Sequence, residues 1–581
     1  MTDSDAGDVL AVEIQQLSKQ FIVGKRTINA LQDISLTISK GQVIGLIGPD
    51  GAGKTTLLRL VAGLLVPSKG TINVFGHDSV QQGDDIHRLC GYMPQRFGLY
   101  EDLSVAENLN LYADLHGVSL SVRQQRIQDL MHMTGLSAFT QRLAGRLSGG
   151  MKQKLGLACT LLSHPALLLL DEPSVGVDPV SRRELWSIIE QQVESQGMTV
   201  LLSTAYMDEA ERCHQVVILD EGELLAANSP DFFKSKMQGY SYLLTHPELS
   251  NRLLQSQLIE QTNIIDAVIQ GDKVRIIHRH QVLPVFTGTL EAVCIEATPP
   301  RLEDAFIRIL RERHPVAIGE TINPPHKDSS FISDDTIIHV QGVDRWFGDF
   351  QAVKKLNFSV KRGEIFGLLG ANGAGKTTTF RMLCGLLPAS NGQLQVAGVD
   401  LRLAAAKARS RIGYMSQKFS LYINLSVLQN LTFFSTAYGL SHKQRKQRIQ
   451  WALQQFELEA VQQSDCSDLP LGYKQRLAMA CALMHEPDIL FLDEPTSGVD
   501  PLARREFWNR TNQLAASGVT VLVTTHFMEE AEYCDRLLIM VEGRILTTGT
   551  PTEIKQQVST AALPEPTMEE AFIQLVEANQ L

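Results

Sequence analysis

Several features that would place a chain in a particular class are missing from this one. Its uninterrupted apolar stretches, such as residues 166–170, fall far short of the roughly 20 residues that a membrane-spanning helix needs. The first five residues, MTDSD, are polar and acidic, and the pattern predicts no secretory signal peptide. The eight cysteines are scattered without a Cys-x-x-Cys pair, which favours small core residues in a reducing compartment.

An excess of positive charge is also missing. The chain has 53 Lys and Arg against 64 Asp and Glu, a formal net charge of −11, whereas proteins that clamp nucleic acid are usually basic. The most basic run, residues 442–448, is more simply the solvated face of a helix, so we expect no nucleic-acid partner. With 581 residues, 44% apolar and 20% charged, the composition is that of a soluble globular protein with several domains.

Two glycine-rich stretches each follow a short apolar run and precede a helix-like sequence. They are Gly48-Pro49-Asp50-Gly51-Ala52-Gly53-Lys54-Thr55-Thr56 and Gly370-Ala371-Asn372-Gly373-Ala374-Gly375-Lys376-Thr377-Thr378. The spacing is that of a P-loop, in which glycines turn backbone N–H groups toward phosphates at a helix N-terminus. The two lysines would reach the β- and γ-phosphates of ATP, and the hydroxyls of Thr55 and Thr377 would bind Mg²⁺.

The two stretches belong to a long internal repeat. The offset of 322 residues between Lys54 and Lys376 recurs between Gln95 and Gln417, between Asp171 and Asp493, and at other aligned pairs. It slips by one residue only near Ala205 and His526. A constant register over such a distance indicates a tandem duplication of one domain.

Strand-like and helix-like segments alternate in each copy, which predicts an α/β fold with a largely parallel sheet. We expect the first ATPase domain at residues 8–231 and the second at residues 336–557, each with a helical subdomain. A small α+β appendage would occupy residues 232–313, with strands near 273–277 and 292–295 and a helix near 301–306. Residues 314–335 read as a linker, and residues 558–581 as a tail with a short helix.

Each copy has a pair of acids after an apolar strand, Asp171-Glu172 in the first and Asp493-Glu494 in the second. At the carboxyl end of a strand, the aspartate can hold the Mg²⁺ shell and the glutamate can polarise an attacking water. Gln95 and Gln417, which share one register, would ligate Mg²⁺ and sense the γ-phosphate.

One further motif points to a family. Leu147-Ser148-Gly149-Gly150 lies between the Gln95 and Asp171 motifs and resembles the signature motif of ABC ATPases. The resemblance implies that the two copies pair head to tail within the chain, with each ATP on the P-loop of one copy and under the signature helix of the other. Ser148, Gly149 and Gly150 would then bind the γ-phosphate of the ATP on the second P-loop.

The resemblance extends to other positions. His526 is expected at the γ-phosphate and the attacking water, and Phe21 and Phe347 resemble the aromatic residue that stacks on adenine, with a place in the core as the alternative. Shared phrases at residues 91–100 and 413–422 are similar to those of drug-export ATPases. This resemblance implies ABC-2-type permease subunits in the membrane as partners and a cytoplasmic location, peripheral on the inner face of the cell membrane.

The two copies depart from the family pattern at different places. Ala205 stands where the second copy has His526, and Pro470-Leu471-Gly472 replaces the signature Ser-Gly-Gly. Under head-to-tail pairing both departures fall in the site built on the first P-loop. We therefore expect one intact site, which hydrolyses ATP, and one degenerate site, which turns it over slowly.

The alternative functions are a soluble tandem ABC ATPase that acts on ribosomes or another nucleoprotein, and a regulatory ATPase with no membrane partner. The net acidity and the altered second signature argue against the first, and no residue pattern supports the second. The sequence identifies neither the exported substrate nor a role for the appendage.

Overall fold

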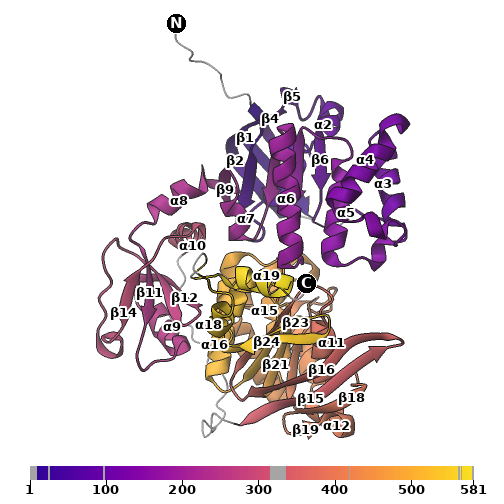
Figure 1. Ribbon diagram of the computed structural model, residues 1–581. Coiled ribbons are helices and arrows are strands. Elements are labelled where there is room, and N and C mark those ends of the chain that lie inside the picture. The colour runs from indigo at the N-terminus through magenta and orange to yellow at the C-terminus, as the bar shows by residue number, and fades with distance from the viewer. Residues whose placement is uncertain are drawn as a thin grey trace. The chain divides into compact units, whose positions relative to one another are not determined.

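The computed structural model describes residues 10–23, 26–95, 98–314, 335–417, 419–560, 563 and 565–578 (Figure 1). It divides into two compact units. Unit 1 comprises residues 1–238 and 299–313, and unit 2 comprises residues 239–298 and 314–581. The predicted linker lies almost entirely outside the described residues. Each copy of the repeat therefore forms the main part of one unit.

Unit 1 is built on two sheets. The larger has the order β10(Glu223–Asn228), β9(Gln215–Asp220), β3(Val43–Ile47), β8(Thr199–Ser203), β7(Leu167–Asp171), β6(Cys90–Met93). Its strands pair in parallel except β10, which is antiparallel to β9. The three central strands are buried along their whole length, as expected for a parallel sheet covered on both faces. The smaller, antiparallel sheet has the order β2(Arg26–Ser39), β1(Leu10–Val23), β4(Lys69–Val74), β5(His77–Asp78).

The helices of unit 1 fall into three groups. α1(Lys54–Val61), α2(Gly83–Leu89), α6(Pro179–Gln196) and α7(Met207–Glu211) alternate with strands of the larger sheet. α3(Val105–Leu115), α4(Leu120–Met133) and α5(Gly149–Leu161) contact one another and form the helical subdomain expected for the family. α8(Pro230–Lys236) and α10(Leu302–Arg313) pack together beside α7, although some 65 residues separate them in the chain.

The second copy repeats this arrangement in unit 2. Its larger sheet has the order β20(Ile412–Met415), β21(Ile489–Asp493), β22(Thr520–Thr524), β17(Ile365–Gly370), β23(Arg536–Val541), β24(Arg544–Gly549). Its smaller sheet has the order β16(Phe350–Lys361), β15(Thr336–Phe347), β18(Asn391–Val396), β19(Val399–Asp400). The helices are α11(Lys376–Leu383), α12(Leu401–Arg409), α13(Val427–Ala437), α14(His442–Gln455), α15(Leu471–Ala482), α16(Pro501–Ala516), α17(Met528–Ala531), α18(Pro551–Gln556) and α19(Met568–Ala578). The match confirms the predicted duplication of an α/β ATPase fold.

The rest of unit 2 is a small separate body that comes from the middle of the chain. The sheet β12(Ile264–Gln270), β13(Lys273–His278), β11(Ser241–Thr245), β14(Cys294–Ala297) is antiparallel and carries α9(Asn251–Ile259) (Figure 1). It has its own core, in which Leu244, Leu254 and Leu258 are fully buried. We call residues 239–298 the insert.

The helix after the insert belongs with the first ATPase copy. α10 packs on α7 and α8, and the backbone N–H of Leu302 donates to Glu211 Oε1 at 2.9 Å. In the second copy α19 packs in the same way on α17 and α18. The insert thus interrupts copy 1 between two helices that copy 2 joins by a short segment. Among the described helices, none is long and apolar enough to cross a membrane.

Two candidate nucleotide sites

Both glycine-rich stretches form the same tight loop between a buried strand and a helix. Gly53, which precedes α1, has φ +100°, and a Cβ added there would lie 2.6 Å from the carbonyl oxygen of Ala30. Gly375, which precedes α11, also has φ +100°, with a Cβ 2.8 Å from the carbonyl oxygen of Ala352. Only glycine fits these positions without strain. Neither helix has a side-chain cap, so its first N–H groups remain available to a phosphate.

The two P-loop lysines are buried inside their own loops. Lys54 Nζ donates to the carbonyl oxygens of Gly48 and Pro49 at 2.7 and 3.0 Å. Lys376 makes the same two contacts in its loop, at 2.6 and 3.1 Å. An ammonium held in this position by carbonyl oxygens stands where it can pair with phosphate oxygens instead. The loop, the lysine and the uncapped helix together fit a nucleotide triphosphate.

Oxygen donors gather beside each P-loop, at the carboxyl ends of the adjacent strand and of the strand beyond it. In the first copy Thr55 Oγ1 donates to Asp171 Oδ1 at 3.0 Å, and Ser203 Oγ donates to the same carboxylate oxygen at 2.8 Å. In the second copy Thr524 Oγ1 donates to Asp493 Oδ1 at 2.6 Å. Hydroxyl, carboxylate and amide oxygens are the ligands that Mg²⁺ prefers, so the donor set fits this ion.

Glu172 and Glu494 have an unusual backbone conformation. Their φ angles are +51° and +48°, in the left-handed region that costs a non-glycine residue free energy. In each copy the glutamate N–H donates to the backbone and the side-chain oxygen of one residue in the next strand, Ser203 or Thr524. These bonds hold the strained turn that directs the carboxylate away from its strand.

The surroundings of the two glutamates differ at one position. Gln95 Nε2 donates to Glu172 Oε2, and Gln417 Nε2 donates to Glu494 Oε2 at 2.5 Å. In the second copy His526 Nδ1 also lies 3.4 Å from Glu494 Oε2, and its side chain is 2% exposed. The first copy has buried Ala205 at the equivalent position.

The pKa values of the two glutamates are shifted in opposite directions. Burial raises the pKa of Glu172 above its ordinary value, and the charge of Lys54 opposes this only in part. Burial acts in the same direction on Glu494, but His526, Lys376 and Gln417 bring the pKa of Glu494 below its ordinary value. The second copy therefore holds its glutamate more firmly as the carboxylate, which is the form that accepts a proton.

The two signature segments also differ in how their helix begins. Ser148 caps α5, and its hydroxyl accepts a hydrogen bond from the N–H of Met151 at 3.3 Å. Gly150 is required by packing, because a Cβ there would lie 2.7 Å from Ser181 Oγ. Pro470 precedes α15 without a side-chain cap, and Leu471 occupies the first turn. The first signature thus presents a hydroxyl and two glycines, whereas the second has lost the hydroxyl and the first glycine and keeps Gly472.

Each candidate adenine-stacking residue lies near the turn of a β-hairpin in the smaller sheet of its copy. Phe21 is half-buried in β1, with Lys19 Nζ 5.1 Å from its ring centre. Phe347 at the end of β15 is 46% exposed, and the Arg345 guanidinium lies 4.6 Å from its ring centre. Both rings are accessible to a planar ligand and neither is a core residue.

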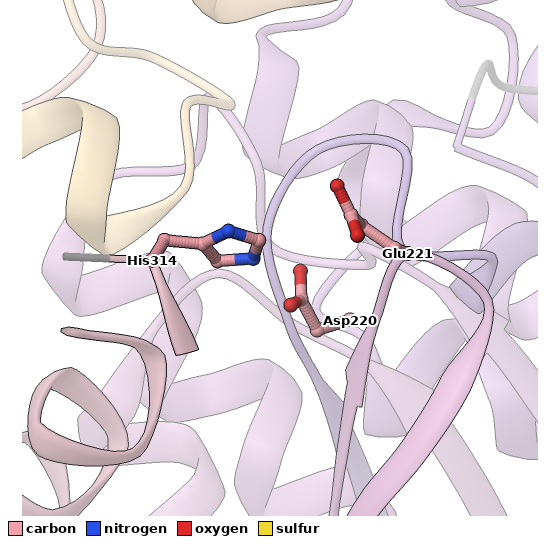
Figure 2. A group of neighbouring side chains, drawn as sticks. All are labelled: Asp220, Glu221 and His314. Atoms are coloured by element: carbon pink, nitrogen blue, oxygen red, sulfur yellow. The ribbon is translucent and has the colours of Figure 1, made fainter. Parts of the chain in front are cut away.

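We assign no metal to a separate cluster of two acids and a histidine. Asp220, Glu221 and His314 offer atoms within 4.8 Å of one another (Figure 2). Arg313 already lies against these acids, with its Nε 3.0 Å from Asp220 Oδ2 and its guanidinium 2.8 Å from Glu223 Oε2. The guanidinium compensates the carboxylate charge, so the cluster fixes the end of α10.

Sequence reasoning missed several residues that hold the sites in shape. Ser203 and Thr524 fix both the aspartate and the strained glutamate, and Tyr92 OH lies 3.5 Å from Asp171 Oδ2. In the second copy Tyr414 OH lies 3.4 Å from Asp493 Oδ2. The sequence could have indicated these residues, because they occupy equivalent positions in the two copies. They were missed because their side chains do not form a known motif.

A P-loop at the end of a parallel strand, with an aspartate–glutamate pair at the end of the next strand but one in the same sheet, defines a P-loop ATPase. Residues 31–175 and 353–497 match the family model described as ABC transporter. The "Probable multidrug ABC transporter ATP-binding protein YbhF" of Escherichia coli strain K12 is 50% identical over 94% of this chain and 95% of its own. The chain belongs to the ABC transporter ATP-binding family, and it is an ATPase with two fused cassettes.

Two more distant relatives carry related names. A "Putative ABC transporter ATP-binding protein" of Methanosarcina acetivorans is 29% identical over 90% of this chain and 84% of its own. The "Nod factor export ATP-binding protein I" of Cupriavidus metallidurans is 42% identical over 38% of this chain and 72% of its own. The first spans both cassettes, whereas the second matches a length of about one.

Proposed function

We propose that the chain energises an exporter through separate ABC-2-type permease subunits, and that it works on the cytoplasmic face of the membrane as a peripheral protein. The names of two relatives support export, since one is described as a multidrug transporter subunit and the other as a Nod factor export protein. The exported substrate of this chain is not specified by its ATP sites.

Exposed apolar side chains near the two glutamines support a membrane partner. In the first copy Tyr100 is 55% exposed. In the second copy Tyr422 and Ile423 are 47% and 59% exposed, and the ring of Tyr422 packs against Phe433. We infer that the permease binds here, because these residues follow Gln95 and Gln417 closely and would sense movement of the loops.

ATP and Mg²⁺ would be held as the donor groups suggest. The P-loop N–H groups and the two lysines would bind the phosphates, while Phe21 and Phe347 would stack on adenine. Thr55 with Asp171 and Gln95 would hold one Mg²⁺, and Thr377, Asp493 and Gln417 the other. When bound, Mg²⁺ neutralises phosphate charge as the γ-phosphate bond breaks.

We further propose that the two sites are unequal. In head-to-tail pairing, the second P-loop with Glu494 and His526 would meet the first signature, Ser148-Gly149-Gly150. The first P-loop, with Glu172 and Ala205, would meet Pro470-Leu471-Gly472. In this pairing, the positions at which a phosphate-contacting group is replaced all lie in one site. That site would bind ATP and turn it over slowly.

The observation that carries this proposal is the contact between His526 and Glu494. An imidazole 3.4 Å from the carboxylate lowers the pKa of Glu494 against the effect of burial and orients the group, whereas Glu172 has a hydrogen bond from Gln95 and the charge of Lys54 but no imidazole. A glutamate kept ionised and oriented is the better general base for an attacking water. Hydrolysis would therefore proceed mainly at the second P-loop.

Purification from membranes tests the partner. The tagged chain, extracted in mild detergent, should retain integral membrane proteins, and Tyr422→Glu with Ile423→Glu should release them while ATP binding stays normal. Leu403→Glu is the matched control, because Leu403 is an 86% exposed residue of α12 in the same unit. Recovery with ribosomes, or unchanged recovery of membrane proteins in the double variant, would contradict the proposal.

A further inference from the structure

The insert is attached to one ATPase copy and packs on the other. The residues on either side of the insert, 238 and 299, belong to unit 1. The helices that flank the insert, α8 and α10, pack together in that unit. The body of the insert, residues 239–298, belongs to unit 2 together with the second copy. Figure 1 shows α9 and β12 beside α16 and α18 of that copy.

A buried ion pair lies at the centre of the contact. Arg505 of α16 donates to Asp266 of β12, and both side chains are only 5% exposed. A charge taken out of water is costly unless its partner is present, so removal of one member of such a pair is strongly destabilising. This pair therefore selects for the docked arrangement.

Polar contacts surround the pair. Gln255 of α9 donates to Asn509 Oδ1 at 3.1 Å and accepts from Asn512 Nδ2 at 2.8 Å, both on α16. Arg252 of α9 forms an ion pair with Asp535, at the entry to β23, and donates to the Gly363 carbonyl oxygen at 3.3 Å. The hydrogen bonds of Gln255 and the two ion pairs require particular positions of their partners. Together they fix the position of the insert on α16.

The hairpin between β12 and β13 lies close to side chains of the second copy. A Cβ on Gly271 would lie 3.2 Å from both Glu532 Oε2 and Lys555 Nζ, and 3.5 Å from Thr552 Oγ1. The φ of +61° at Gly271 also favours glycine. The insert thus approaches α18 and the end of α17 as well as α16.

The docking face of the second copy is only partly shared by the first, where Arg183 matches Arg505 but other contact residues differ. At the equivalent positions of the first copy, Ser187 stands for Asn509 and His214 stands for Asp535. A histidine in place of Asp535 lacks the carboxylate that pairs with Arg252. A serine in place of Asn509 is too short to make the hydrogen bond of the asparagine amide. The first copy therefore lacks part of the set of side chains that binds the insert.

We propose that the insert is a clasp, an interaction module of copy 1 whose partner is the α16–α18 face of copy 2 in the same chain. The clasp is independent of nucleotide, because the contacts given above for the described residues involve neither a P-loop nor a signature residue. It keeps the two cassettes joined when ATP is absent. The clasp also contacts α16, and the N-cap residue of this helix, Asp500, lies six residues after Glu494.

Cleavage of the chain between the copies tests the clasp. A site-specific protease sequence is placed within residues 320–330, in the predicted linker, and the cut protein is analysed with a metal chelator and without nucleotide. The two fragments should elute together at the mass of one chain, 64.3 kDa plus the added sequence. Asp266→Arg or Arg505→Asp should weaken their association at least about a hundredfold.

Paired variants keep the result interpretable. Asp266→Arg combined with Arg505→Asp should restore much of the association, and Glu291→Arg, a charge reversal at an exposed residue of the insert, should leave it unchanged. If a charge reversal unfolds the uncut chain, Gln255→Ala with Asn512→Ala replaces it. Separation of the wild-type fragments, persistence of the complex in folded variants, or the mass of a two-chain assembly would overturn the proposal.

Discussion

His526 Nδ1 lies 3.4 Å from Glu494 Oε2, and no such contact is possible at Glu172 because residue 205 is alanine. Both glutamates share the same strained turn and the same hydrogen bond from a glutamine. The two copies thus use one scaffold and differ in one group that orients the carboxylate. Together with the altered second signature, this difference is the basis of the unequal sites that we propose.

Loss of the imidazole should remove most hydrolysis. His526→Ala is expected to lower the ATP turnover number by about 10²–10⁴, the usual range for a group that positions a proton transfer. ATP binding should stay near wild type, as checked by equilibrium binding of a fluorescent nucleotide. Ala205→Ser is the matched control in the other copy. A similar loss of turnover in both variants would show that the two positions are equivalent.

The first signature should matter more than the second. Ser148→Ala removes both the cap of α5, which is worth about 1 kcal/mol of stability, and the hydroxyl that we assign to the γ-phosphate. We expect turnover to fall at least tenfold, with a small drop in melting temperature. Pro470→Ala should have little effect on either quantity. Steady-state kinetics and calorimetry measure both, and the reverse order of effects would contradict head-to-tail pairing.

One thiol should react rapidly in the folded protein. Cys294 in the insert is exposed, whereas the other seven cysteines are buried. Burial raises the pKa of the Cys90 thiol to about 12 and raises the pKa of the remaining six as well. Since the thiolate is the reactive form, these seven should stay unmodified up to pH 9.

A thiol-reactive dye should therefore label one site per chain at pH 8, and Cys294→Ser should abolish that labelling. Denaturation should release the other seven thiols. Rapid labelling of several cysteines in the native protein would mean that the cores described above open readily. The same reaction at Cys294 supplies a probe on the insert for the cleavage experiment.

The P-loop lysines should contribute to binding in both copies. Lys54→Ala and Lys376→Ala each remove an ammonium that lies within its own loop, 2.6–3.1 Å from the loop carbonyl oxygens. Each variant should bind one nucleotide per chain where the wild type binds two. Lys376→Ala should abolish hydrolysis, while Lys54→Ala should retain part of it. Equal residual turnover in the two would count against the assignment of roles.

Much of the fold followed from the sequence because the repeat has a constant register. The offset of 322 residues places the glycine-rich turns and the acid pairs at matching strand ends, and the structure confirms two copies of one α/β ATPase fold. The helix that begins at Gly149 was also predictable, since serine is a common N-cap residue and Ser148 precedes it.

Other features depend on contacts between distant segments, which no local pattern reveals. Nothing around Asp266 indicates that it pairs with Arg505, 239 residues further along the chain, and α10 reads from sequence as the end of the insert although it packs on copy 1. The strained φ of Glu494 is likewise imposed by Thr524 from a neighbouring strand. Such tertiary constraints override local preference.

The most direct test of unequal sites is ATP turnover of the complex with its membrane subunits, compared among wild type, Glu494→Gln and Glu172→Gln, with a count of trapped nucleotides. The substitutions preserve shape and remove only the carboxylate. We expect Glu494→Gln alone to abolish turnover and to retain ATP, while Glu172→Gln keeps most of the activity. An equal fall in both variants would show that Ala205 and Pro470 are tolerated and that the two sites hydrolyse ATP alike.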